Sequence, residues 1–161
     1  MKDSVSLQRA QLLHPAIRQQ VIDTITEIES KSQFVVRIVQ GLRTVEEQDD
    51  LYAQGRTKPG PIVTKAKGGS SFHNYGLAID FALLYDGKLS WDLNTDFDHD
   101  NVKDWQEVVD AFKAKGFSWG GEWKSLKDYP HLEKTFGLNW HDCFYKYAHS
   151  DFIDGTKYIR L

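Results

Sequence analysis

The sequence predicts a small α+β domain in which helices pack against a short, mainly antiparallel sheet. Three observations support this fold class. The chain has 161 residues with a hydrophobic content of 40%, which is enough for one well-buried core spanning residues 1–161. Helix-like and strand-like segments both occur, but without the regular alternation of a doubly wound parallel sheet. The chain contains no internal repeat or low-complexity segment.

Composition excludes several classes of function. The net charge is −3, and lysine and arginine are spread along the chain, so charge-driven binding to nucleic acid or to an anionic membrane is not expected. No apolar run is long enough to span a bilayer and no signal peptide is visible, so we expect synthesis in the host cytoplasm and no membrane insertion. We also expect a monomer. The single cysteine, Cys143, excludes an internal disulfide and a thiolate-rich metal site, so any metal must be held by nitrogen and oxygen.

The N-terminal part of the chain predicts a helix followed by a strand. Apolar residues recur at helical spacing over residues 14–30, where Pro15 suits the first turn. This helix is expected to be amphipathic and to pack on the core. Residues 34–40 are β-branched and end in Gly41, a pattern typical of a strand that runs into a loop.

A second helix and a long loop follow. Thr44 and Glu47 have the spacing of a capping box, which predicts a helix over residues 44–54 that ends before Gly55. Residues 55–72 are rich in glycine, proline, lysine and serine, which indicates an irregular loop. Loops of this length inside compact domains are usually functional.

The second half of the chain begins with a strand over residues 76–84. Larger apolar residues alternate there with small ones, and Asp80 is the one charge on the small-residue face. Residues 104–115 carry an apolar stripe typical of a helix, which Gly116 ends. The tail of the chain contains a short extended run and then an aromatic-rich segment.

Two histidines and two aspartates form the main chemical signal. His73 lies at the mouth of the loop and Asp80 on the strand that follows, while Asp128 precedes His131, which begins a second extended run. Two interpretations fit this spacing: a hydrogen-bonded His–Asp pair, or a catalytic zinc site in which two imidazoles and one carboxylate leave a fourth position open to water. In a zinc site, Asp128 would act as general base, taking the proton of the water and returning it to the leaving amine.

These residues lie in two segments that resemble a known family. Residues 70–80 (SSFHNYGLAID) are similar to the S-x-H-x-x-G-x-A-x-D signature of the zinc D,D- and L,D-peptidases of peptidoglycan, the VanY and VanX relatives. Residues 128–133 (DYPHLE) resemble the second motif of that group, in which an acid precedes a metal-binding histidine. The likeness extends to the branch of L-alanyl-D-glutamate endopeptidases, many of them phage endolysins. It spans residues 14–137 and includes the segments 41–44 (GLRT), 47–48, 51–57, 62–64 and 117–123 (FSWGGEW).

The resemblance implies a bacteriolytic zinc peptidase with the metal at the sheet. Zinc would be held by His73, Asp80 and His131, and the enzyme would hydrolyse the bond between L-Ala and D-Glu in bacterial peptidoglycan stem peptides after release from the cell. VanX relatives usually carry glutamate as the base where this chain has Asp128, although aspartate also occurs in the endolysin-like branch.

The resemblance also suggests roles for three neighbouring residues. Arg43 is expected to bind the oxyanion that forms from the scissile carbonyl, or a carboxylate of the substrate; the alternative is an exposed arginine at a helix entry. Ser71 could bind substrate or a metal ligand, or it could cap the loop. Glu133 could accept a hydrogen bond from a ligand imidazole, but a surface position on a strand is the favoured interpretation.

Residues 92–107 form an acidic insertion that resembles an EF-hand calcium loop. Five acidic side chains and one carbonyl fill its oxygen positions, while Asn101 replaces the usual glycine and Lys103 an apolar residue. Ca²⁺ would order the insertion beside the active site, with a structural or regulatory effect; the alternative is a solvated acidic loop before a helix. The expected calcium ligands are Asp96, Asp98, Asp100, the Val102 carbonyl, Asp104 and Glu107.

Two other functions remain open. A D-Ala-D-Ala carboxypeptidase or dipeptidase would share the metal site but have a different substrate pocket. A non-catalytic wall-binding module would keep zinc only for structure. The fragments released from peptidoglycan distinguish the two peptidases, and the substitution Asp128→Ala distinguishes an enzyme from a binding module.

Overall fold

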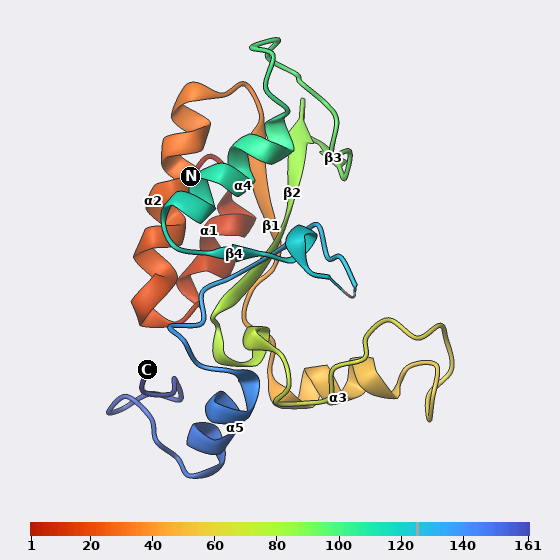
Figure 1. Cartoon of the computed structure of the whole chain (residues 1–161), viewed down its shortest axis with the longest axis vertical. Helices are drawn as coiled ribbons and strands as arrows, with labels where there is room; N and C mark the ends of the chain where they lie inside the picture. Colours follow the sequence, from red (N-terminus) through yellow and green to blue (C-terminus); the bar gives the residue numbers. More distant parts are fainter. Residues whose placement is uncertain (125) are drawn as a thin grey trace.

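An antiparallel sheet forms the centre of the molecule, and helices lie against it (Figure 1). The computed structural model describes residues 1–124 and 126–161. The strand order is β1-β2-β5-β4, with β3 paired to β2 off this path, and each of these pairings is antiparallel. The predicted α+β fold class is therefore confirmed. The strands are β1 (Val35–Gln40), β2 (Ala78–Tyr85), β3 (Lys88–Ser90), β4 (Ser118–Trp119) and β5 (His131–Glu133).

Helices α1, α2 and α4 pack together along one side of the sheet (Figure 1). Ile17, Val21 and Ile25 of α2 are fully buried, which is the apolar stripe that the sequence predicted for this helix. The helices are α1 (Ser4–Gln11), α2 (Pro15–Lys31), α3 (Val45–Ala53), α4 (Asp104–Ala114) and α5 (Trp140–Ala148), with short 3₁₀ turns η1 (Phe72–Tyr75) and η2 (Gly120–Glu122).

The central strand β2 places its charge away from the main core. The Phe81 ring centroid lies 4.4 Å from that of the buried Trp105 on α4, so Phe81 points to the helices. Successive side chains of a strand point to opposite faces, and Asp80 therefore points to the other face. The alternation predicted for this strand is what directs the carboxylate out of the apolar layer.

Helix α3 projects from the sheet together with the loop that follows it (Figure 1). Glu47 N donates to the Thr44 hydroxyl at 3.1 Å, and Thr44 N donates to the Glu47 carboxylate at 2.8 Å, so the predicted capping box is present. Residues 55–71 are irregular, as predicted, and Gln48 Nε2 ties them to α3 by donating to the Ala66 carbonyl at 2.9 Å.

Two helices and two short strands were not predicted. Helix α1 is short and carries only two buried residues, while α5 is aromatic-rich, a composition that gives little helical signal. The start of α5 was marked by Asn139, which caps His141 N at 2.9 Å and Asp142 N at 3.1 Å. Among the residues described, none of the helices has the length and apolar character needed to cross a bilayer.

Candidate metal centre

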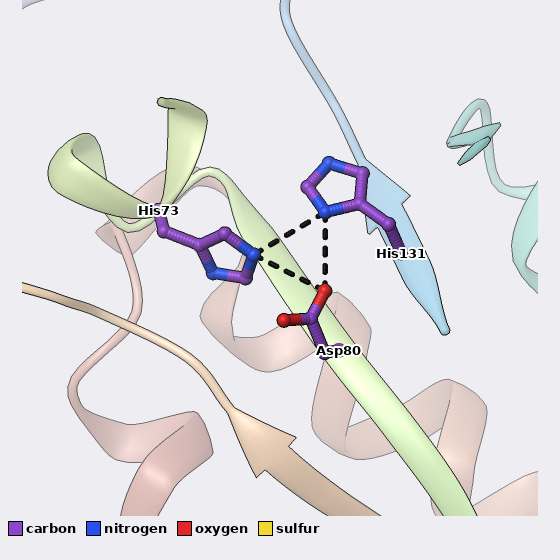
Figure 2. Close-up of side chains that lie close together, drawn as sticks. All are labelled: His73, Asp80 and His131. Carbon is purple, nitrogen blue, oxygen red and sulfur yellow. Dashed lines mark hydrogen bonds and ion pairs between the residues drawn. The ribbon is translucent and has the colours of Figure 1, made fainter. Parts of the chain in front are cut away.

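Three side chains from separate elements converge at the sheet (Figure 2): His73 from η1, Asp80 from β2 and His131 from β5. The β2–β5 pairing sets Asp80 directly opposite His131, and opposite residues in antiparallel strands share a face. Gly76 turns the chain from η1 into β2 with a φ of 67°. A Cβ at Gly76 would lie 2.7 Å from the His14 nitrogen, so glycine is needed to bring His73 back to the strand.

The spacing of the three donor atoms matches a single metal ion. His73 Nε2 lies 3.2 Å from Asp80 Oδ1, and His131 Nδ1 lies 3.1 Å from the same oxygen. The two nitrogens are 3.3 Å apart. Ligands at about 2.0–2.1 Å from a tetrahedral ion are separated by about 3.3 Å. His73 and His131 are 3% and 5% exposed, so their geometry is held by packing.

The outer nitrogens of the imidazoles determine which atoms face the centre. His73 Nδ1 lies 2.8 Å from the Gly41 carbonyl, which can only accept, so Nδ1 carries the hydrogen and Nε2 the lone pair. His131 Nε2 lies 2.9 Å from the Glu133 carboxylate, which leaves the lone pair on Nδ1. Three electron-rich atoms thus meet, and they require a shared cation. The favoured surface position for Glu133 was wrong, because its carboxylate orients the His131 ring.

The pKa values of Asp80 and His131 are shifted because these side chains lie so close together. Burial opposes ionisation of Asp80, but hydrogen bonds from His131 and His73 outweigh burial and hold the pKa of this carboxyl well below its usual range. Burial lowers the pKa of His131, yet the Asp80 and Glu133 carboxylates outweigh burial and raise this pKa to about 9. In the metal-free protein a proton therefore occupies the centre at neutral pH and competes with a metal ion.

Asp128 lies beside this centre, on the segment that leads into β5. Asp128 N donates to the Gly120 carbonyl at 3.0 Å, and His131 N donates to the Asp128 carbonyl at 3.2 Å. A Cβ at Gly120 would lie 2.4 Å from the Asp128 carbonyl oxygen, so glycine permits this close approach. Burial and the Asp80 carboxylate raise the pKa of Asp128, against the lowering effect of the imidazoles and Arg43. A carboxyl with a raised pKa is suited to proton transfer.

Arg43 and Ser71 lie on the segments that hold His73. Arg43 N donates to the His73 carbonyl at 3.0 Å, and its Nη1 donates to Gln48 Oε1 at 2.9 Å. Burial lowers the pKa of Arg43, while nearby carboxylates, chiefly Asp80, oppose this effect. His73 N donates to Ser71 Oγ at 3.3 Å, so Ser71 caps η1. The structure thus brings Arg43 to the site as a partly buried cation and gives Ser71 a capping contact.

The acidic insertion lies at the opposite end of β2 from the metal centre. The Phe97 ring centroid is 4.9 Å from that of Tyr85, the last residue of β2, whereas Asp80 belongs to the first half of the strand. The expectation that this insertion lies beside the active site was therefore wrong.

Within the insertion, the acidic side chains form two groups that share Asp98. Asn101 has a φ of 71°, the left-handed conformation expected where it replaces glycine, and Val102 and His99 are exposed. One oxygen each of Asp98 and Glu107 is buried without a hydrogen-bond partner among the described residues. Two groups place one oxygen of each member within 4.8 Å of the others: Asp96 with Asp98 and Asp104, and Asp98 with Asp100 and Glu107.

Comparisons with known proteins agree with the metal centre. A family model described as D-alanyl-D-alanine carboxypeptidase matches residues 64–134, which include all three converging residues. The chain is 52% identical over 122 residues to the peptidoglycan L-alanyl-D-glutamate endopeptidase CwlK of Bacillus subtilis (strain 168), covering 75% of this chain and 72% of that protein. It is 30% identical over 90 residues to the L-alanyl-D-glutamate peptidase of Listeria phage A118, covering 53% of this chain and 30% of the phage protein.

Solved structures show the same fold. The L-Ala D-Glu endopeptidase ChiX of Serratia marcescens is 25% identical, with a TM-score of 0.54 and coverage of 83% of this chain and 88% of that chain. The D,D-dipeptidase VanXYg has a TM-score of 0.52 at 19% identity and covers 88% of this chain and 61% of that chain. The second likeness concerns the fold alone.

Proposed function

Since the chain belongs to the family of peptidoglycan metallopeptidases that contains these relatives, we propose that it hydrolyses the bond between L-alanine and D-glutamate in peptidoglycan stem peptides. CwlK and ChiX are both named for this activity, and the match to CwlK extends over three quarters of the chain. A D-alanyl-D-alanine carboxypeptidase is the second candidate, because the matching family model carries that description.

One observation carries the proposal: three donor atoms, two nitrogens of buried imidazoles and one oxygen of the part-buried Asp80 carboxylate, lie within 3.3 Å of one another. We propose zinc as the ion, since nitrogen and oxygen donors with tetrahedral spacing and one position left for water are typical of catalytic zinc sites. Zinc bound by His73, Asp80 and His131 would supply Lewis-acid activation of water and of the scissile carbonyl.

The residues around the centre would move the proton and bind the substrate. Asp128, with its raised pKa, would accept the proton of the attacking water and return it to the amine of D-glutamate as the amide bond breaks. Arg43, at the same site, would hold negative charge on the substrate or on the reacting carbonyl. Glu133 and the Gly41 carbonyl would keep both imidazoles in the orientation that metal binding needs.

Mass analysis of fragments released from purified peptidoglycan tests this proposal. Zinc-loaded protein is expected to release peptides with a new N-terminal D-glutamate, and chelation of the metal should stop the release. Free D-alanine instead would support the carboxypeptidase. The Asp128→Asn variant should keep zinc and lose most of the activity. A wall-binding module would release nothing with either protein.

We also propose that the acidic insertion binds Ca²⁺. Two overlapping groups of three carboxylates, and buried oxygens of Asp98 and Glu107 without partners among the described residues, support this proposal. Because the insertion packs on the far end of β2, the expected effect of Ca²⁺ is on stability more than on catalysis. Calorimetric titration of zinc-loaded protein with Ca²⁺ should show binding, and equal heats for Ca²⁺ and buffer would refute the proposal.

A further inference from the structure

The Arg43 guanidinium is an unpaired cation next to the metal centre. Among the described residues, no carboxylate lies within ion-pair distance of it, and its Nη1 donates instead to the neutral amide oxygen of Gln48 at 2.9 Å. Its Nε is buried and has no hydrogen-bond partner in the described part of the chain. Leaving a buried charged donor unsatisfied is costly, so such groups are commonly completed by a ligand.

Gln48 determines which edge of the guanidinium stays free. Gln48 is 0% exposed, and its Nε2 donates to the Ala66 carbonyl at 2.9 Å, which turns its Oε1 toward Arg43. With Nη1 engaged in this way, the edge formed by Nε and Nη2 has no partner among the described residues. This edge presents two parallel N–H groups, the geometry that binds both oxygens of a carboxylate.

Arg43 also connects the metal centre to a groove along α3. The carboxylates of Asp80, Glu47 and Asp128 all influence its charge, Asp80 most strongly. Arg43 also lines a groove of about 490 Å³ together with Gln40 of β1, Leu51 of α3 and Gln54, the residue that follows α3. A peptide with its scissile bond at the metal centre would therefore extend past this arginine.

The chemistry of the proposed substrate supplies the missing partner. A glutamate that follows the scissile bond has two carboxyl groups, and only one of them can continue the peptide. The other remains a free carboxylate close to the bond that is cleaved. Resting on the proposed function, we propose that the free edge of Arg43, oriented by Gln48, binds this carboxylate and makes the enzyme selective for D-glutamate in its ionised form.

Two matched substrates test the proposal in the wild-type enzyme. One stem peptide carries the free carboxylate on D-glutamate, and the other carries a carboxamide of the same shape at that position. We expect a kcat/KM roughly 10- to 100-fold lower for the carboxamide, which corresponds to the loss of one charge-assisted pair. Equal kcat/KM values for the two peptides would overturn the proposal.

Variants separate carboxylate binding from stabilisation of the oxyanion. Arg43→Lys keeps the charge but loses the two-pronged edge, and Gln48→Glu gives Arg43 an internal carboxylate partner. Both should lower kcat/KM for the carboxylate peptide, mainly through KM, and affect the carboxamide peptide much less. If kcat falls equally for the two peptides, Arg43 stabilises the oxyanion and does not bind the carboxylate, which would overturn the proposal. Gln8→Glu, the same change at an exposed site on α1, is the control and should leave both values unchanged.

Binding without turnover gives an independent measurement. Calorimetry compares the product peptide that begins with D-glutamate with its carboxamide form, and the first should bind at least about tenfold more tightly to wild type. This preference should vanish in Arg43→Lys, and its persistence there would refute the assignment. If wild type cleaves neither peptide, the proposed function fails, and the calorimetric preference still decides whether the carboxylate site exists. Thermal unfolding of each variant identifies losses that come from misfolding.

Discussion

The metal centre and the acidic insertion both gather donor groups, but they hold them in different ways. At the metal centre, three residues arrive from three elements, and each imidazole has its outer nitrogen hydrogen-bonded, to the Gly41 carbonyl or to Glu133. In the insertion, all donors come from residues 96–107, and several carboxylates accept only backbone N–H groups. The two imidazoles of the metal centre are oriented before an ion binds, because the outer nitrogen of each already has its hydrogen-bond partner.

In the insertion, by contrast, the carboxylates lie close together and repel one another. Burial and the surrounding carboxylates, Asp100 first, raise the pKa of Glu107 to about 7. At the metal centre the carboxylate is stabilised, since the pKa of Asp80 is lowered by two imidazoles. Attraction between the Asp80 carboxylate and the imidazoles therefore holds the metal centre together without its ion. In the insertion the carboxylates repel one another, and a bound cation is needed to make their approach favourable.

Removing one carboxylate from each region should give the largest contrast. Asp80→Asn is expected to lower peptidase activity by more than about 1000-fold, since it removes a metal ligand and with it several kcal/mol of transition-state stabilisation. Asp98→Asn, assayed without calcium, should stay within about threefold of wild type. Bound zinc is measured in parallel. Similar activity losses in both variants would show that the two regions are not independent.

The position of the base gives the next largest effect. In Gly120→Ala the added Cβ would meet the Asp128 carbonyl oxygen at 2.4 Å, so the segment that carries Asp128 must shift. A displacement of about 1 Å near the reaction can cost about 100-fold in kcat. The added Cβ would also lie 3.1 Å from the Cβ of His131, so bound zinc is measured in parallel and kcat is compared at equal zinc content. If kcat in Gly120→Ala equals that of wild type, the exact position of Asp128 does not limit the reaction and the prediction is wrong.

The pH dependence of stability should distinguish metal-free from metal-loaded protein. The pKa of His131 rises from 6.5 to about 9 on folding. Its proton therefore stabilises the fold fully below about pH 6.5, and this contribution is lost as the pH rises through about 9. The unfolding midpoint of chelated protein should fall by several degrees from pH 6.5 to 9.5. Asp80 contributes no change in this window, because its lowered pKa leaves it ionised throughout.

Zinc should abolish this dependence, since His131 then binds the ion without a proton. Glu133→Gln should reduce the dependence in the chelated protein, because one of the two carboxylates that raise the pKa is gone. A midpoint that stays constant with pH in chelated wild type would contradict the proposed protonation.

The acidic insertion should show the smallest effect on the unfolding midpoint. The cause there is repulsion between carboxylates, whereas at the metal centre it is attraction between carboxylates and a protonated imidazole. The pKa of Glu107 rises from 4.5 to about 7 on folding, so its contribution to stability is present at low pH and is lost as the pH rises through about 7. Glu107→Gln should raise the unfolding midpoint of calcium-free protein at pH 8 by about 1–3 °C. Millimolar Ca²⁺ should raise the midpoint of wild type but not of this variant. A rise of equal size in both would exclude Glu107 as a ligand.

The sequence alone determined the elements with strong periodic or capping signals. Helices α2 and α4 have the apolar spacing that buries one stripe, and α3 begins at the predicted capping box. The two motifs around His73 and His131 identified the converging residues, because these residue types in that order resemble a known family. Asn101 and the acidic spacing were also visible, since an EF-hand loop is a local pattern.

Only the tertiary structure decided how these residues act together. The β2–β5 register sets Asp80 opposite His131, and this pairing joins segments that are distant in the chain. The role of Glu133 as an orienting acceptor, and of Gln48 as the partner of Arg43, depends on packing that no local pattern reports. Helix α5 and the placement of the acidic insertion at the far end of β2 were missed for the same reason: long-range contacts select among conformations that local sequence leaves nearly equal in energy.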